Sequence, residues 1–395
     1  MTDFIRTRQA FHLPEGVTYL DGNSLGPMPV AAKERVSRMM AEEWSEMLIT
    51  GWNRAGWYVQ PRKVGDRIAR LIGAGSGEVV MGDTLSIKVF QAVSAARALR
   101  PERRVILSDN GNFPSDLYVA EGLARAVDAE LRVVAPEEVE HAIDDQLAVL
   151  MITEVDYRTG RRHDMKALTA RAHQVGALTV WDLAHSAGAV DVDLTGADAD
   201  FAVGCTYKYL NGGPGAPAFI WTHPRHADAA QPILQGWMGH AAPFAFDLGY
   251  TPAPGIERMR VGTPPVIAMT ALDAALDIWD GVELADLRAR SVELTEAFIA
   301  GVEANCPGVT LNSPRDPDMR GSQVSFRHPQ GYAVMQALIA EGVIGDFRAP
   351  DVLRFGFAPL YNDLQDVQRA VDILARILRE ETWDQPHFHE KADVT

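Results

Sequence analysis

The sequence predicts an α/β protein with a larger domain, in which helices cover both faces of a mostly parallel sheet, and a smaller α+β domain. Between about residues 55 and 275, short apolar runs alternate with longer amphipathic ones, which is the pattern of successive βαβ units. Beyond residue 275 the chain changes to long helical patterns that flank strand-like runs. A chain of 395 residues also exceeds what one hydrophobic core usually supports. We therefore expect residues 55–275 to form the larger domain, and residues 1–54 with 276–395 to form the smaller one.

The expected elements of the larger domain follow one another in regular order. Runs of apolar residues predict the strands, and segments of helical periodicity predict the helices between them. Such connections join parallel strands, because each helix crosses back over the sheet before the next strand begins. The expected strands are residues 105–108, 131–134, 148–153, 177–181, 201–203 and 216–221, and the expected helices are residues 115–127, 136–145 and 165–175.

The smaller domain shows a different pattern. Residues 277–302 and 364–380 have long helical periodicity, and they flank the strand-like runs 321–327 and 352–357. The first 50 residues contain an apolar, methionine-rich helical pattern at 31–48. We expect this helix to pack with the smaller domain or to bridge two subunits.

The composition limits the kinds of partner. The formal net charge is −16, and the chain has no basic stripe of the kind that binds nucleic acid or anionic membranes. The N-terminal segment 1–10 is charged and lacks the apolar stretch of a secretory signal, and no apolar run approaches about 18 residues. Cys205 and Cys306 form neither a disulfide framework nor a metal-spaced cluster. These features predict a cytoplasmic protein without a bound metal, a nucleic-acid partner or a membrane association.

One lysine lies in a position suited to chemistry. Lys208 belongs to the glycine-rich segment 204–215, between the expected strands 201–203 and 216–221. A free lysine titrates near pH ~10.4, so a nucleophilic lysine must be desolvated or lie beside another positive group. A turn at a strand end inside an α/β domain can meet both conditions. If Lys208 is considered without its neighbours, the alternative is that it is an ordinary solvent-exposed lysine in a turn.

An aspartate at a neighbouring strand end strengthens this interpretation. Asp182 follows the expected strand 177–181 and precedes Lys208 by 26 residues. In an open α/β sheet, ligands lie beyond the carboxyl ends of the strands, where Thr153 also falls. Pyridoxal 5′-phosphate (PLP) needs this layout, because it requires a lysine imine and a carboxylate that keeps the pyridine nitrogen protonated. If Asp182 is considered without Lys208, the alternative is that it caps the N-terminus of a following helix.

Two further segments suit the phosphate and the ring of such a cofactor. Residues 82–87 open a helix whose amides and hydroxyls suit a phosphate, although a plain helix cap explains them equally. Phe113 precedes another helix, where it can stack on a pyridine ring or belong to the core. Both assignments depend on the pair formed by Asp182 and Lys208.

Several motifs along the chain point together to one family. The most discriminating are Asn-Ser-Leu-Gly at 23–26 and Thr-Tyr-Lys-Tyr-Leu-Asn-Gly-Gly-Pro-Gly at 206–215, whereas Asp-x-x-His at 182–185 is shared more widely. On these motifs the chain resembles kynureninase, a family of fold type I (aspartate-aminotransferase-like) PLP enzymes, nearly from end to end. The other matching segments are residues 19–22, 112–118, 155–160, 236–240, 260–265 and 353–362.

The resemblance implies a reaction. The family hydrolyses the Cβ–Cγ bond of L-kynurenine, or of 3-hydroxy-L-kynurenine, to anthranilate or 3-hydroxyanthranilate and L-alanine in tryptophan catabolism. By this resemblance, Lys208 holds PLP as an imine and removes the Cα proton, and Asp182 pairs with the pyridine nitrogen. The reaction is expected to pass through quinonoid and gem-diol intermediates. Tyr207 is the expected acid that protonates Cβ.

The resemblance also implies binding residues. Arg354 is expected to take the substrate α-carboxylate. Trp237 and Thr263 match positions that reach the phosphate from the neighbouring subunit, which implies a homodimer with a composite active site. Residue 263 is Thr where family members that prefer the 3-hydroxylated substrate carry Asn, so we expect kynurenine to be preferred. Further substrate contacts are expected from Asn23, Ser24 and Trp57, and further cofactor contacts from Leu85, Ser86, Phe113, Asp116, Thr153, His185 and Tyr207.

Two other functions are compatible with PLP binding. A cysteine desulfurase or selenocysteine lyase on the same fold needs a mobile cysteine in an exposed polar loop. Cys306 follows a helix and Cys205 lies in the strand that leads to Lys208, so neither matches that requirement. A non-catalytic PLP-binding regulator normally carries an added DNA-binding module, for which this sequence has neither the length nor the composition.

Overall fold

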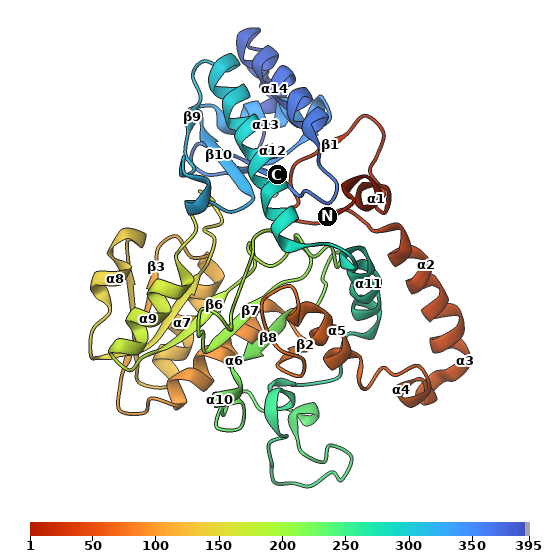
Figure 1. Cartoon of the computed structure of the whole chain (residues 1–395), viewed down its shortest axis with the longest axis vertical. Helices are drawn as coiled ribbons and strands as arrows, with labels where there is room; N and C mark the ends of the chain where they lie inside the picture. Colours follow the sequence, from red (N-terminus) through yellow and green to blue (C-terminus); the bar gives the residue numbers. More distant parts are fainter. Residues whose placement is uncertain (392–395) are drawn as a thin grey trace.

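The computed structural model describes residues 1–391, and its largest feature is a seven-stranded sheet (Figure 1). Strand β8 runs antiparallel to both of its neighbours, and the other neighbouring strands of the sheet are parallel. The expected mostly parallel sheet is therefore confirmed. Across the sheet the strands are β2 (Val79–Met81), β8 (Phe219–Thr222), β7 (Phe201–Gly204), β6 (Leu178–Asp182), β5 (Leu147–Thr153), β3 (Val105–Asp109) and β4 (Glu130–Val134).

Helices cover both faces of this sheet. Successive residues of a strand point to opposite faces, so Val149 and Val180 belong to one core cluster, whereas Leu150 and Trp181 belong to the other. The first cluster packs under α6 (Leu85–Ala98) and α7 (Pro114–Ala126). The second packs under α5 (Gln60–Ala69), α8 (Val139–Ala142), α9 (Met165–Gln174) and α11 (Val266–Leu276).

A second, smaller layer contains a four-stranded antiparallel sheet in the order β12 (Asp346–Arg348), β13 (Val352–Gly356), β10 (Gln323–Arg327) and β9 (Thr310–Leu311). Its core cluster is shared with α12 (Leu284–Asn305), α13 (Gly331–Ala340) and α14 (Leu364–Arg379). Strand β1 (Thr18–Tyr19) pairs with β11 (Val343–Ile344), which ties the N-terminal segment to this layer. The expected α+β character of the C-terminal region is confirmed.

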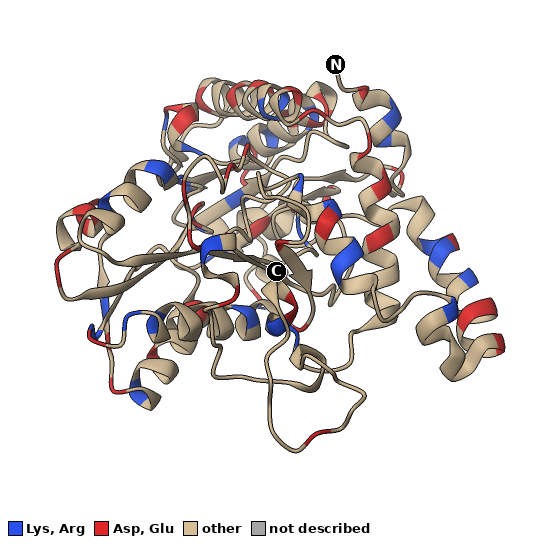
Figure 2. Ribbon diagram, turned by 60° about the horizontal axis from the view of Figure 1, so that its bottom comes forward, with Lys and Arg blue, Asp and Glu red and all other residues tan. Residues whose placement is uncertain are grey.

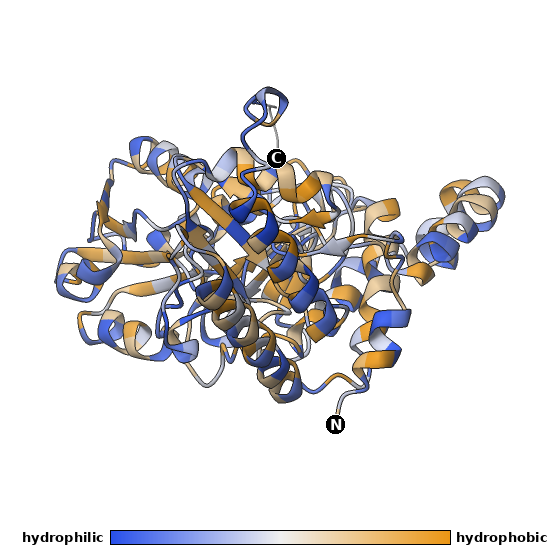
Figure 3. Ribbon diagram, turned by 90° about the horizontal axis from the view of Figure 1, so that it is seen from above, coloured by the Kyte–Doolittle hydropathy of each residue, from blue (hydrophilic) through white to orange (hydrophobic). Residues whose placement is uncertain are grey.

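The N-terminal arm differs in part from the expectation. The pattern at 31–48 is helical, but α2 (Val30–Arg38) continues as a π-helix, η1 (Met39–Trp44), before α3 (Ser45–Met47) and α4 (Gly51–Arg54). Helix α2 packs against α11 of the larger layer. Figures 1 and 3 show that the rest of this arm projects from the body.

Three element boundaries also differ. Helix α12 begins at Leu284, because the chain turns at Gly281, whose φ of +85° is left-handed. The expected helix at 136–145 is a short 3₁₀ turn, η3 (Pro136–Glu138), followed by the four residues of α8. The run at 216–221 joins the sheet only from Phe219. The division into residues 55–275, 1–54 and 276–395 stays a prediction, and the last four residues of the third range lie outside the described part.

Acidic and basic residues are mixed along the outer helices (Figure 2). Within residues 1–391, no helix combines the length and the apolar character needed to cross a membrane.

Candidate active site

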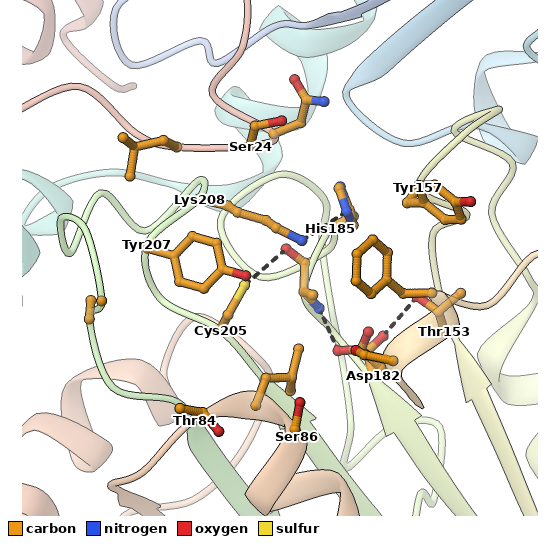
Figure 4. Close-up of a pocket in the computed structure, with 18 of the residues that line it drawn as sticks. Ser24, Thr84, Ser86, Thr153, Tyr157, Asp182, His185, Cys205, Tyr207 and Lys208 are labelled. Atoms are coloured by element: carbon orange, nitrogen blue, oxygen red, sulfur yellow. Dashed lines mark hydrogen bonds between the residues drawn. The ribbon is translucent and has the colours of Figure 1, made fainter. Parts of the chain in front are cut away.

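A cavity of about 600 Å³ opens beyond the carboxyl ends of β5, β6 and β7, at the edge where ligands lie in open α/β sheets (Figure 4). Both layers contribute side chains to it. The larger layer supplies Thr84, Leu85, Ser86, Phe113, Ser115, Thr153, Tyr157, Asp182, Ala184, His185, Cys205, Tyr207, Lys208, Pro214, Gly215 and Ala216, the N-terminal segment supplies Asn23, Ser24 and Leu25, and the smaller sheet supplies Arg348 and Arg354.

Lys208 follows β7 and reaches into this cavity. Its Nζ lies 2.9 Å from Nε2 of His185, and 5.9 Å and 5.7 Å from the ring centroids of Phe113 and Tyr207. The N-terminal segment holds the lysine loop from the other side, because the Gly26 N–H donates to the Tyr207 carbonyl at 2.7 Å. A Cβ at position 26 would stand 2.5 Å from the Lys208 carbonyl oxygen, so only glycine fits there. The motif at 23–26 is thus explained by its contact with the lysine loop.

Asp182 ends strand β6 beside this lysine. One oxygen of its carboxylate accepts a hydrogen bond from the Ala184 N–H at 2.9 Å. Asp116, near the start of α7, is buried behind it, and its Oδ2 has no hydrogen-bond partner. Burial raises the pKa of both carboxyls, and the charge of Asp182 raises that of Asp116 further, whereas Lys208 favours the charged form of Asp182. These effects favour a charged Asp182 beside a protonated Asp116, an arrangement that can receive a cationic ring nitrogen.

The start of α6 forms the opposite end of the cavity. Thr84 is the N-cap residue, but its side chain makes no capping hydrogen bond, and the first amides of the helix lack partners within the helix. The preceding residue, Asp83, has a φ of +58° and lies 3.2 Å from the buried Lys88 ammonium. Burial lowers the pKa of Lys88 to about 8. Amides and hydroxyls of Thr84–Ser86 thus present donors that suit a phosphate.

A cluster of arginines lines the side of the cavity formed by the smaller sheet. Arg354 on β13 is buried, and its Nε donates to Asp346 at 2.7 Å and its Nη2 to the Ser24 hydroxyl at 2.9 Å. Its remaining donors reach the other Asp346 oxygen and the Tyr157 carbonyl. Arg348 also pairs with Asp346 at 2.7 Å, and about a third of its side chain is exposed.

The charges of this cluster do not cancel. Burial, together with the negative charge of Asp346, raises the pKa of the nearby Asp21 carboxyl to about 7. Below that pH Asp21 is mostly protonated, so Asp346 is the acidic residue paired with the two arginines and the cluster keeps an excess of positive charge. The cluster can therefore bind an anionic group such as a substrate carboxylate.

Tyr207 lies between the lysine and a buried thiol. The neighbouring Cys205 and burial raise the pKa of Tyr207, so its phenol stays protonated, as a proton donor requires. Figure 4 shows Tyr207, Lys208 and Cys205 on the same side of the cavity. The Cys205 thiol faces the Ala184 carbonyl at 3.9 Å.

The predicted residues fall into two groups. Those named for the lysine, the ring, the phosphate and the carboxylate line one cavity, with Asp116 directly behind it. Trp57, Trp237 and Thr263 do not line it. Trp57 is buried, and its indole N–H donates to Glu43 at 3.0 Å. Trp237 is 42% exposed, and Thr263 is also exposed.

Tyr157, Arg348, Asp346 and Gln323 lie near the site but are not among the predicted site residues. Tyr157 lies in a motif that was noted, and its ring meets Phe113 edge-on at 5.1 Å. Arg348, Asp346 and Gln323 come from the smaller sheet. Asp346 and Arg348 stand at alternate positions just before the strand of Arg354, and this pattern could have indicated that they face the same side. No local pattern indicates Gln323.

Comparison with known proteins agrees with this geometry. Residues 287–374 match the model of the kynureninase C-terminal domain. Kynureninase from Burkholderia pseudomallei (strain 1106a) and that from Pseudomonas fluorescens are each 52% identical to the chain over 397 aligned positions, which cover 98% of this chain and 95% of each relative.

Solved structures share the fold at low identity. A cysteine desulfurase from Thermococcus onnurineus NA1 superposes with a TM-score of 0.81 at 19% identity, covering 96% of this chain and 99% of the other. A C-DES variant with glycine covalently linked to its PLP cofactor superposes with a TM-score of 0.80 at 16% identity, covering 95% and 99%. These likenesses show the architecture of fold type I PLP enzymes, and the identity over nearly the whole length shows that the chain belongs to the kynureninase family.

Proposed function

We propose that this protein is a PLP-dependent hydrolase that cleaves the Cβ–Cγ bond of L-kynurenine to give anthranilate and L-alanine. The observation that supports this most strongly is the joint position of Lys208, Asp182 and Arg354 around one cavity, in a chain so similar to kynureninases. A lysine and an aspartate suit PLP, and a buried arginine suits the carboxylate of an amino-acid substrate.

The residues of the cavity fit PLP. Lys208 would hold the cofactor covalently, the negative Asp182 would pair with its ring nitrogen, and the donors of Thr84–Ser86 would bind its phosphate. Behind Asp182, an Asp116 oxygen has no hydrogen-bond partner, which suits a site that receives a cationic ring. When bound, PLP supplies an electron sink that stabilises negative charge at the substrate Cα and Cβ.

The side chains of this protein would carry out the proton transfers. The Lys208 amine takes the proton from the substrate Cα, and Arg354 holds the α-carboxylate so that this proton faces the amine. A water molecule adds to the γ-carbonyl, and the Cβ–Cγ bond electrons move to Cβ as the γ-carbon leaves in the carboxyl group of anthranilate. Tyr207 then donates its proton to Cβ, and the Lys208 ammonium returns a proton to Cα, which completes L-alanine.

The assay that tests this function offers the purified protein L-kynurenine, 3-hydroxy-L-kynurenine and L-cysteine. We expect anthranilate and alanine from kynurenine, a lower kcat/KM for the 3-hydroxy substrate because Thr263 lacks an amide, and no sulfide from cysteine. Both cysteines are buried, so a double variant, Cys205→Ala with Cys306→Ala, should keep the activity. Sulfide from cysteine without anthranilate from kynurenine would contradict the proposal.

We further propose that the active unit is a homodimer in which Trp237 and Thr263 complete the partner's site. Both residues are exposed and lie outside the cavity of their own chain. Two projecting segments also expose large apolar side chains, as dimer-forming surfaces do. These are Met40, Trp44, Leu48 and Ile49 on the arm, and Phe244, Phe246 and Leu248 in the loop after Trp237.

Subunit mixing tests the composite site. Lys208→Ala chains and Trp237→Ala/Thr263→Ala chains are expected to be inactive separately. Heterodimers of the two contain one site with every residue intact, so part of the activity should return. Verified heterodimers without activity would exclude the contribution in trans.

A further inference from the structure

Gln323 extends from the smaller sheet into the wall of the active site. It lies on β10, is 1% exposed, and its side chain contacts the larger layer. Its Nε2 donates to the carbonyls of Asp156 at 2.8 Å and Tyr157 at 3.0 Å. Carbonyl oxygens only accept hydrogen bonds, so both amide protons of Gln323 are committed to them. The orientation of the amide is therefore fixed, and its oxygen faces His185.

This orientation determines where His185 carries its proton. Oε1 of Gln323 lies 3.0 Å from Nδ1 of His185, and an amide oxygen can only accept, so Nδ1 is protonated. Burial and the positive charge of Lys208 lower the pKa of His185 well below its ordinary value, so the ring is neutral. A neutral imidazole has one N–H. Nε2 therefore presents a lone pair to the Lys208 Nζ, 2.9 Å away.

The groups around His185 favour the same state. The charged side chains that act on it are Lys208 after β7, Arg354 on β13 and Arg348 at the end of β12, and all three disfavour the imidazolium. The ring thus remains a neutral hydrogen-bond acceptor toward Lys208.

We propose that Gln323 is a positioning residue that holds His185 as the Nδ1–H tautomer and thereby keeps the lone pair of Lys208 free for proton abstraction. In the opposite tautomer, the Nε2–H would donate to the neutral lysine amine and occupy the lone pair that must accept the substrate proton. In the Nδ1–H tautomer, one lysine N–H donates to Nε2 of His185 and the lysine lone pair points elsewhere. The effect on proton abstraction rests on the proposed role of Lys208 as the base. The tautomer of His185 does not depend on that role.

The tautomer can be measured without any substrate. Full-length protein labelled with ¹⁵N-histidine, with and without PLP, is examined by long-range ¹H–¹⁵N correlation, and the His185 signals are identified by their loss in His185→Gln. We expect an imidazole protonated on Nδ1 that stays neutral from pH 5.5 to 8.5. An Nε2–H signal, or titration near pH 6.5, would overturn the proposal whatever the substrate of the enzyme proves to be.

Two variants test the role of Gln323 itself. Gln323→Met keeps the length of the side chain but removes the acceptor, together with the donors to the Asp156 and Tyr157 carbonyls, so His185 should lose its preference for Nδ1–H. We expect kcat to fall about 10- to 100-fold, the range typical when the partner that orients a metal-binding histidine is removed, with KM within about threefold. Gln323→Glu offers a charged acceptor and should make His185 titrate near neutral pH, with activity lost on the acid side of the profile.

A matched control separates this role from a structural one. Gln60 is also a buried glutamine and lies far from His185 in the chain. Among the described residues its side chain makes one hydrogen bond, to Thr270 at 3.1 Å. Gln60→Met should leave the His185 spectrum and the pH profile unchanged. If Gln323→Met left kcat and the Nδ1–H tautomer unchanged, or if Gln323→Glu left the titration of His185 unchanged, Gln323 would not be the positioning residue.

Discussion

Asp182 and Asp200 are buried aspartates at the ends of neighbouring parallel strands, yet they lie at opposite edges of the sheet and their pKa values are shifted in opposite directions. Asp182 ends β6 at the cavity, and Asp200 immediately precedes β7 at the other edge. Oxygens of Asp200 are paired with His173 at 2.8 Å, His226 at 2.8 Å and Arg225 at 2.7 Å. The side chain of Asp182 accepts one hydrogen bond among the described residues.

The difference in partners explains the difference in pKa. Burial opposes ionisation at both positions, but the hydrogen bonds and charges around Asp200 lower its pKa overall, whereas burial raises that of Asp182. A buried carboxylate with all its partners stabilises the fold. One that lacks partners destabilises the free protein and is prepared for a ligand. Four predictions test this contrast, in order of decreasing expected effect.

Asp200→Asn should have the largest effect, and on stability. Removing one member of a buried ion-paired network costs about 3–5 kcal/mol, because Arg225 and the histidines lose their counter-ion. Folded Asp200 has a lowered pKa, so its contribution is present above about pH 3.8 and lost below it. His173 has a raised pKa, so its contribution is present below 6.5 and lost above it.

Denaturant unfolding as a function of pH measures this effect. The difference between the wild type and Asp200→Asn should therefore be greatest between about pH 4 and 6.5. Asp198→Asn, which removes a more exposed partner of the same Arg225, is the control and should cost less than about 1 kcal/mol. Equal losses for both variants would contradict the contrast.

Asp182→Asn should affect activity and leave the fold intact. We expect kcat to fall about 10²- to 10³-fold, the size of loss typical when one preorganised group that stabilises developing charge is removed. Because the folded pKa of this carboxyl is raised, its ionised form destabilises the free protein above its unfolded pKa, so the amide should leave the unfolding free energy of the PLP-free chain unchanged or higher. A large loss of stability would place Asp182 with Asp200 as a structural residue.

Arg354→Ala tests a residue that is both paired, like Asp200, and exposed to the cavity, like Asp182. Arg354 pairs with Asp346 and also lines the cavity. We expect a loss of about 2–4 kcal/mol in kcat/KM, mostly through KM, with PLP retained. Steady-state kinetics and the absorbance of the bound cofactor measure the two parts. A normal KM would show that another group, Arg348 first, binds the substrate carboxylate.

The smallest expected effect is a pH dependence of substrate binding. Asp21 has a pKa raised to about 7, so above that pH it adds a negative charge beside Arg354 and Arg348. The KM for kynurenine should then rise roughly 3- to 10-fold over the next pH unit. Asp21→Asn should remove this rise without raising KM at pH 6. A KM profile that is the same in both proteins would exclude Asp21 as its cause.

Local signals were sufficient for much of the site. Lys208, Asp182 and Thr153 each stand where an apolar run ends, and Ser86 and Phe113 stand where a helical pattern begins, so periodicity placed them at one edge of the sheet. The same signals gave most strands of the larger domain with small shifts at their ends, whereas the expected helix at 136–145 contains only a 3₁₀ turn and a four-residue helix, and α5, β2 and α11 were not predicted. These signals also failed at Gly281, where one left-handed residue separates α12 from the preceding helical turn inside a continuous helical pattern.

The sequence by itself determined the order of strands and helices, the lysine and aspartate at neighbouring strand ends, and the family, because these depend on short-range periodicity and contiguous motifs. Only the tertiary structure decided that Gln323 meets His185, 138 residues away, and that Asp346 joins Arg354 to Arg348. It also decided that Asp200 is satisfied whereas Asp116 is not. Burial and hydrogen-bond partners arise from contacts between distant segments, and they set the tautomer and the pKa values on which the chemistry depends.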